Sequence, residues 1–185
     1  MSRTRLAIFV VAFAGLGAQC RDGHDRHLQE GARALADGRF QEAAAHYAAA
    51  TRANTRSAAA FFNLGYALYR QDEFERAGHA FASAVAHSSG DERARGLYNL
   101  GNALAKQGRL GDALSAYRSA LRLDPGDDDA RHNYVLVERW LEQTTDRGGA
   151  APAPLTPAEA DRLLDKVLSG LRPVESTTPR SQRDW

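Results

Sequence analysis

Apolar residues recur along the chain in a pattern that repeats about every 34 residues. Each unit contains a glycine, followed nine residues later by a Phe or Leu and three residues after that by an Ala. The three sets are Gly31, Phe40 and Ala43, then Gly65, Phe74 and Ala77, then Gly101, Leu110 and Ala113. An aromatic residue follows in each unit, at Tyr47, Phe81 and Tyr117. Small residues where two helices touch and large residues where they interdigitate are typical of helix-turn-helix repeats.

The period predicts an all-α solenoid of three such repeats. They span residues 24–57, 58–91 and 94–127. Pro125 follows the second helix of the third repeat, where a proline stops a helix because it lacks a backbone N–H. The first two repeats have Thr55 and Ser89 at that position, so we expect their exits to be less sharply defined.

One more helix is expected at residues 128–143, directly after the third repeat. Ala130, Tyr134, Val137 and Leu141 fall on one face of it, with helical spacing. Acidic residues at 127–129 suit the positive end of a helix dipole. A solenoid otherwise ends in an exposed apolar face, so we interpret this segment as a capping helix.

The C-terminal part of the chain predicts a linker, a short helix and a tail. Residues 144–157 contain glycine, alanine and proline but few residues that can pack, which is typical of a linker. Thr156 and Glu159 then form the pattern of a capping box. Leucine and valine side chains form one stripe along the helix expected at residues 158–171. We expect residues 172–185 to be a disordered tail.

The N-terminus has the pattern of an export signal. Basic residues precede an apolar run and then small residues, the order found in secretory leaders, so we expect a signal peptide at residues 1–18. The run is shorter than the roughly 18–20 apolar residues that a helix needs to span a bilayer. Cys20 is a candidate lipidation site, although Gln19 before it is not a small residue. Release into the periplasm and lipid anchoring in the cell envelope both stay open.

Composition and motifs argue against several functions. The 24 basic residues almost balance the 23 acidic residues, whereas a nucleic-acid binder is normally far more basic. A single cysteine excludes a disulfide framework. The chain lacks the sequence motifs of phosphate loops, zinc proteases, haem attachment and serine hydrolases. Cys20, His24 and His27 are the nearest approach to a metal cluster and lack a fourth ligand, so we expect no metal, no cofactor and no catalysis.

The segments at residues 97–104 and 120–125 resemble the tetratricopeptide repeat (TPR) family. This resemblance implies a concave groove lined by fixed positions of each repeat's first helix, and hence a function in protein binding. On the matching positions of this sequence, and on their continuation into the capping helix, the expected peptide-binding residues are Asn63, Tyr66, Tyr69, Arg70, Arg95, Tyr98, Asn99, Asn102, Lys106 and Asn133. His132 lies beside the last of these.

Asparagine recurs at one position of the groove, as Asn63, Asn99 and Asn133. An amide can donate to and accept from the backbone of an extended peptide, so these residues could form a binding ladder. They could equally bond within or between helices, and the tyrosines could pack the inner surface. The basic side chains of the groove favour an acidic segment.

Residues 98–108, 129–134 and 155–165 together resemble the TPR members of bacterial Bat (aerotolerance) systems. This resemblance implies an exported adaptor that works with a von Willebrand A-type protein and a complex containing an AAA+ ATPase. The C-terminal helix would then dock a second partner or fold back into the groove. The alternative is an outer-membrane lipoprotein with a structural role in envelope or cell-wall assembly, attached through Cys20.

Overall fold

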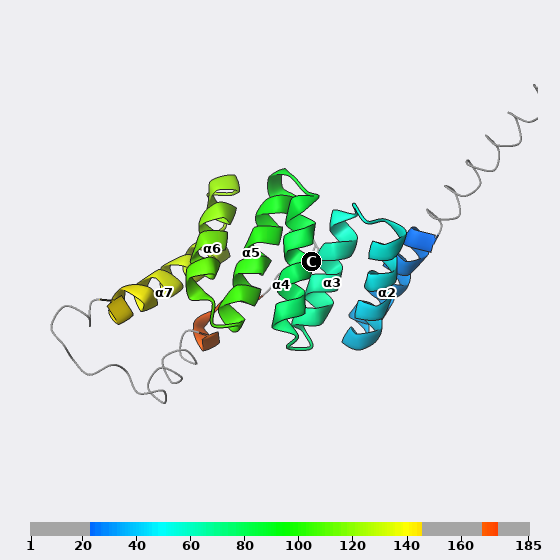
Figure 1. Cartoon of the computed structure of the whole chain (residues 1–185), viewed down its shortest axis with the longest axis horizontal. Coiled ribbons are helices and arrows are strands. Elements are labelled where there is room, and N and C mark those ends of the chain that lie inside the picture. Colours follow the sequence, from blue (N-terminus) through cyan, green and yellow to red (C-terminus); the bar gives the residue numbers. More distant parts are fainter. Residues whose placement is uncertain (1–22, 146–167, 174–185) are drawn as a thin grey trace, which may run out of the picture.

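The computed structural model describes residues 23–145 and 168–173, and all regular structure in these two ranges is helical. The first helix covers residues 23–36, and residues 168–170 form a helical turn at the other end. Between them come α2 (Phe40–Ala53), α3 (Ala58–Tyr69), α4 (Phe74–Ala86), α5 (Gly90–Lys106), α6 (Leu110–Leu123) and α7 (Asp128–Thr145). Successive helices pack side by side along the length of the molecule (Figure 1). The predicted all-α array of paired helices is therefore confirmed.

Some element ends differ from the expected boundaries. α5 begins at Gly90, four residues before the expected start of the third repeat, and has Asp91 and Glu92 in its first turn, where acidic side chains favour a helix N-terminus. α7 continues to Thr145, beyond the expected cap. The predicted signal peptide, Cys20 and most of the predicted linker lie outside the described residues, and the predicted C-terminal helix is described only from residue 168. No helix in the described ranges is both long and apolar enough to cross a bilayer.

The turn inside each repeat has one conformation. Gly38, Asp72 and Gly108 occupy equivalent positions and have φ values of 73°, 60° and 74°. In each case the next residue donates its backbone N–H to the carbonyl five residues earlier, at 2.8–3.1 Å. These left-handed residues close the first helix of each pair, a conformation that favours glycine because it has no Cβ.

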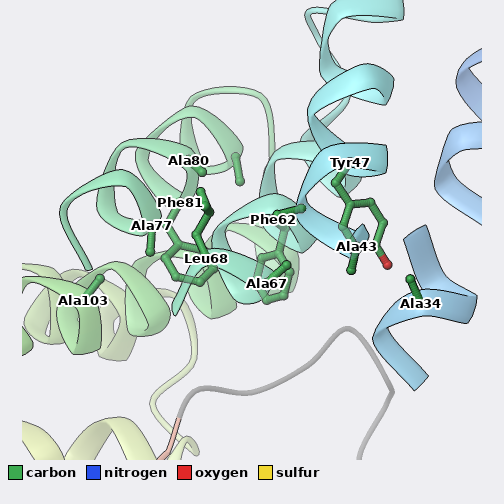
Figure 2. Packing of buried hydrophobic residues seen from close by; sticks show 12 residues of the cluster. Ala34, Ala43, Tyr47, Phe62, Ala67, Leu68, Ala77, Ala80, Phe81 and Ala103 are labelled. Atoms are coloured by element: carbon green, nitrogen blue, oxygen red, sulfur yellow. The ribbon is translucent and has the colours of Figure 1, made fainter. Parts of the chain in front are cut away.

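The core is built from small residues that receive large ones (Figure 2). The rings of Tyr47, Phe81 and Tyr117 are fully buried and lie against the recurring glycines. Alanines such as Ala43, Ala77 and Ala113 are fully buried where neighbouring helices approach closely. The sequence period thus corresponds to one interlocking contact repeated in each helix pair.

Two glutamines join successive repeats. Gln71 Nε2, in the turn after α3, donates to the carbonyl of Phe40, 3.2 Å away, and to that of Ala67 in α3 at 3.0 Å. Gln107 Nε2 makes the equivalent bonds to the carbonyls of Phe74 and Ala103, at 2.9 and 3.0 Å. Each glutamine therefore ties the first helix of one repeat to the second helix of the preceding repeat and fixes their stacking.

Candidate functional site

Residues 168–173 of the chain lie against the first helix of the third repeat and the capping helix (the orange segment in Figure 1, beside α5). We refer to this stretch as the C-terminal segment, and to the surface that holds it as the groove. The groove residues that bond to its backbone are Tyr98 and Lys106 from α5 and His132 and Asn133 from α7. Three of these four, Tyr98, Lys106 and Asn133, are among the predicted peptide-binding residues, and His132 is the residue beside them.

Asn133 recognises the backbone of the segment with both ends of its amide. Its Oδ1 accepts from the backbone N–H of Arg172 at 2.8 Å, and its Nδ2 donates to the carbonyl of the same residue at 3.2 Å. Neither bond involves the side chain of Arg172. Asn133 therefore recognises an extended backbone and does not select the side chain at position 172.

Further donors bind carbonyl groups along the segment. The Tyr98 hydroxyl lies 3.2 Å from the carbonyl oxygen of Arg172 and 2.8 Å from that of Pro173. Lys106 Nζ donates to the carbonyl of Leu168 at 3.4 Å, and a ring nitrogen of His132 lies 3.1 Å from that of Gly170. Donors thus follow the segment from its first described residue to its last.

Two of the groove asparagines, Asn102 and Asn133, belong to one buried hydrogen-bond network. Asn99, Asn102 and Asn133 are fully buried. Asn102 Oδ1 accepts from Asn133 Nδ2 at 2.8 Å and from the Tyr117 hydroxyl at 2.7 Å, while Asn102 Nδ2 is buried without a hydrogen-bond partner. Burial raises the pKa of Tyr117 well above its usual value, which keeps the hydroxyl protonated as a donor. Asn102 thereby orients the amide that meets the segment, so binding and structural roles are combined here.

Side chains of the segment contribute apolar and charged contacts. Leu168 and Leu171 pack against the core formed by α5, α6 and α7. Gly170 passes so close to Leu136 that a Cβ atom there would lie 3.0 Å from Cδ2. The guanidinium of Arg172 forms an ion pair with Asp129. The segment held in the groove is therefore apolar and basic, in contrast with the acidic ligand that the basic groove residues favoured.

The predicted residues of the second repeat lie toward the other side of the segment from α7. Tyr69 and Arg70 line a cavity of about 400 Å³ on the α3 side of the C-terminal segment. Arg70 is held by the Tyr66 hydroxyl at 3.2 Å and lies over the Phe40 ring, with Cζ 4.2 Å from the ring centre. Asn63 is half-buried. The groove thus continues from the segment toward the second repeat.

Arg95 lies apart from the other predicted residues. It lines a separate pocket of about 200 Å³ with Phe62 and Glu92, between α3 and α5.

Two contacts of the segment were not predicted from the sequence, the ion pair of Arg172 with Asp129 and the hydrogen bond of Tyr98 to Pro173. Asp129 was interpreted only as a helix-start residue, and Arg172 and Pro173 were assigned to the tail. Arg172 and Asp129 are 43 residues apart in the sequence, so helical periodicity cannot predict that they pair.

Family profiles and one similar solved structure agree with the repeat architecture. Two tetratricopeptide repeat profiles match residues 28–92 and 94–127. The N-terminal domain of stress-induced protein-1 (STI-1) from C. elegans has a similar structure, with a TM-score of 0.58 and 18% identity, covering 64% of this chain and 97% of that domain. The TPR protein YrrB, described as having an unusual peptide-binding site, aligns with a TM-score of 0.35 and 16% identity, over 77% of this chain and 84% of its own. No curated protein sequence matches the chain.

Proposed function

Because this chain belongs to the tetratricopeptide repeat family, a family of protein-interaction scaffolds, we propose that its groove binds an extended segment of a partner protein. The observation that carries this proposal is the pairing of the Asn133 amide with both backbone groups of Arg172. Main-chain bonds of this kind provide affinity for an extended peptide, and pockets for its side chains provide specificity. The partner segment would occupy the place that residues 168–173 occupy in the structure.

The contacts of the C-terminal segment define the chemistry of that partner. Two leucines three residues apart fill apolar sites, and a basic residue follows to pair with Asp129. A small residue is needed where Gly170 meets Leu136. The expected ligand is therefore a short segment with spaced leucines, a glycine between them and an arginine or lysine after them.

The chain's own segment competes with any such partner. When only a fraction of the protein molecules is in the binding-competent state, the apparent affinity for the ligand is the intrinsic affinity multiplied by that fraction. The partner must displace residues 168–173, so the C-terminal segment acts as an intramolecular competitor. This is the second of the two roles expected for the C-terminal helix, which were docking of another partner or return into the groove.

The test is a binding titration with a labelled peptide that has the sequence of residues 164–176. Leu171→Asp in the full chain should release the internal segment, because a carboxylate is costly to bury in the apolar site. We expect this variant to bind the peptide at least tenfold more tightly than the unchanged chain does. Asn133→Ala added to it should abolish the gain, whereas Asn63→Ala should not. Equal affinity in all four proteins, or equal binding of a scrambled peptide, would refute the proposal.

We further propose that the scaffold works in the bacterial cell envelope, as an exported adaptor of the Bat type with a von Willebrand A-type partner. Support comes from the leader-like residues 1–18 and from the sequence resemblance of residues 98–108, 129–134 and 155–165. A crosslinked pull-down from the native envelope tests it, with Asn133→Ala as the comparison. Recovery of a von Willebrand A-type protein that is lost in the variant supports the adaptor.

The alternative is a lipoprotein with a structural role in envelope or cell-wall assembly. Its support is the position of Cys20 directly after the leader-like segment. Metabolic labelling with a fatty acid, in the unchanged chain and in Cys20→Ser, separates the two proposals. Label that depends on Cys20, together with recovery of cell-wall assembly proteins, favours the alternative.

A further inference from the structure

A cluster of metal-binding side chains lies at the opposite end of the stack from the C-terminal segment. His27 and Glu30 are one turn apart on the first helix, and His46 faces them from α2. One carboxylate oxygen, Glu30 Oε2, lies 3.3 Å from Nδ1 of His27 and 3.1 Å from Nδ1 of His46. The three ligand atoms lie within 4.8 Å of one another, so two helices direct two imidazoles and one carboxylate toward one point.

Burial and exposure at the cluster suit an ion that enters from solvent. The side chains of His27, Glu30 and His46 are 26%, 37% and 28% exposed, so they are partly held by packing and still reachable. The Nδ1 atom of His27 itself is buried and makes no hydrogen bond of good geometry. In the tautomer with the proton on Nε2, this nitrogen carries a lone pair that a metal ion would engage.

A second carboxylate lies near one of the ligands. Glu42 Oε1 lies 3.8 Å from Nε2 of His46, on the far side of the ring from Glu30. A metal-ligating imidazole usually donates its other N–H to a carboxylate, which fixes the tautomer and leaves the first nitrogen free to bind. In this structure 3.8 Å is beyond hydrogen-bond distance and Glu42 also pairs with Arg39, so Glu42 would take the orienting role only after a small shift on metal binding, with Nδ1 of His46 as the ligand.

We propose that His27, Glu30 and His46 bind a divalent transition-metal ion of the zinc type. Imidazole and carboxylate ligands suit zinc, with bonds of about 2.0–2.2 Å, and three protein ligands leave one position for water. The alternative is an ion-pair network, in which Glu30 pairs with the two histidines when they are protonated and with Arg26, whose Nε lies 4.0 Å from Oε1. An ion-pair network needs no metal, so direct metal binding separates the two.

The proposed ion would connect the first helix to α2. Within residues 23–145 no repeat precedes the first helix, so in this range it packs against a neighbouring helix on one side only. An ion that binds only the folded state raises the free energy of unfolding, and this gain grows with the logarithm of the ion concentration once that concentration exceeds the dissociation constant. The site would therefore act as a brace for the N-terminal repeat.

The experiment titrates the full chain, without an added histidine tag, with Zn²⁺ in competition with a chromophoric chelator. Co²⁺ then serves as a probe, because its visible spectrum reports coordination number. We expect one Zn²⁺ per chain, a rise of several degrees in melting temperature, and at least a hundredfold loss of affinity in the His27→Ala/His46→Ala double variant. His79→Ala, which removes an exposed histidine of α4, is the matched control and should bind as the unchanged chain does.

A further control addresses the other ligand set suggested by the sequence. His24 is buried, and its Nδ1 bonds to the carbonyl of Ala50 at 3.0 Å, which leaves it poorly placed as a ligand. Cys20→Ser should consequently leave Zn²⁺ binding unchanged. Loss of binding in Cys20→Ser, retention of it in the double histidine variant, or no binding by the unchanged chain would each overturn the proposed site.

Discussion

A Cβ atom on Gly65 would lie 2.7 Å from Cδ1 of Phe81, closer than two such carbon atoms can pack. The same contact occurs at Gly101, where the nearest atom of Tyr117 would be 2.5 Å away. In each helix pair the aromatic ring of the second helix occupies the space left by the glycine of the first. The recurring glycine and the recurring aromatic residue are therefore two halves of one contact.

This contact predicts that Gly65→Ala destabilises the protein although alanine is the better helix former. Overpacking typically costs about 1–3 kcal/mol, which exceeds the gain of about 1 kcal/mol from helix propensity. Urea unfolding followed by circular dichroism measures the difference. The matched control is Gly111→Ala, because Gly111 is exposed in α6 and an added Cβ would meet no atom within 4 Å. A Gly65→Ala protein as stable as the control would contradict this packing.

Asp72 predicts a substitution with the opposite sign. It occupies the left-handed turn position that Gly38 and Gly108 hold in the other repeats, with a φ of 60°. Glycine adopts this conformation without a Cβ clash, so Asp72→Gly should raise the free energy of unfolding by about 0.5–1 kcal/mol. Asp72→Ala should lower it, since aspartate tolerates positive φ better than alanine does. Changes of the same sign in both variants would show that the turn does not control stability.

Buried tyrosines predict a loss of stability at alkaline pH. Burial raises the pKa of Tyr47 to about 12, and burial with the charge of Asp72 raises the pKa of Tyr69 to about 12. An unfolded tyrosine ionises near pH 10. Because the folded pKa is the higher one, the stabilisation is complete below about pH 10 and is lost as the pH rises toward 12. Urea unfolding at a series of pH values tests this expectation.

The control for that series is Tyr47→Phe, which keeps the ring beside Gly31 and removes the hydroxyl. Its free energy of unfolding should decline less steeply above pH 10 than that of the unchanged chain. A constant stability up to pH 11 in the unchanged chain would mean that neither hydroxyl is protected by the fold.

The sequence predicts the helix pairs because their contacts are local and periodic. Gly101 and Tyr117 are 16 residues apart, and the same spacing recurs in each repeat, so a single alignment of the chain on itself reveals the packing. The end of the first helix is equally visible in Gly38 and Gly108. The equivalent turn at Asp72 is not predicted from the sequence, because aspartate, unlike glycine, gives no clear sign of a positive φ.

The candidate sites are less predictable because they join distant positions. Tyr98, Asn102, Lys106 and Asn133 could be placed in the groove from the resemblance to the tetratricopeptide family, but their ligand could not. Hydrogen bonds between Asn133 and Arg172 span 39 residues and follow no period. The approach of His46 to His27 likewise depends on how the first helix packs on α2. From the sequence, His27 was grouped instead with Cys20 and His24, which are near it in the chain.

The last prediction concerns the exchange of a single amide. The backbone N–H of Arg172 donates to Asn133 Oδ1, so it should exchange slowly with solvent although Arg172 is otherwise exposed. Asn133→Ala removes the acceptor and should make this amide exchange at least tenfold faster, as measured by hydrogen–deuterium exchange with mass spectrometry. Asn63→Ala, on α3, should leave it unchanged. Amides in the middle of α2 report global stability in the same experiment, since α2 belongs to the other core cluster and not to the one that packs against Leu168 and Leu171. If Arg172 exchanges as slowly in Asn133→Ala as in the unchanged chain, the amide does not hold the segment, and the groove must bind through its apolar contacts with Leu168 and Leu171.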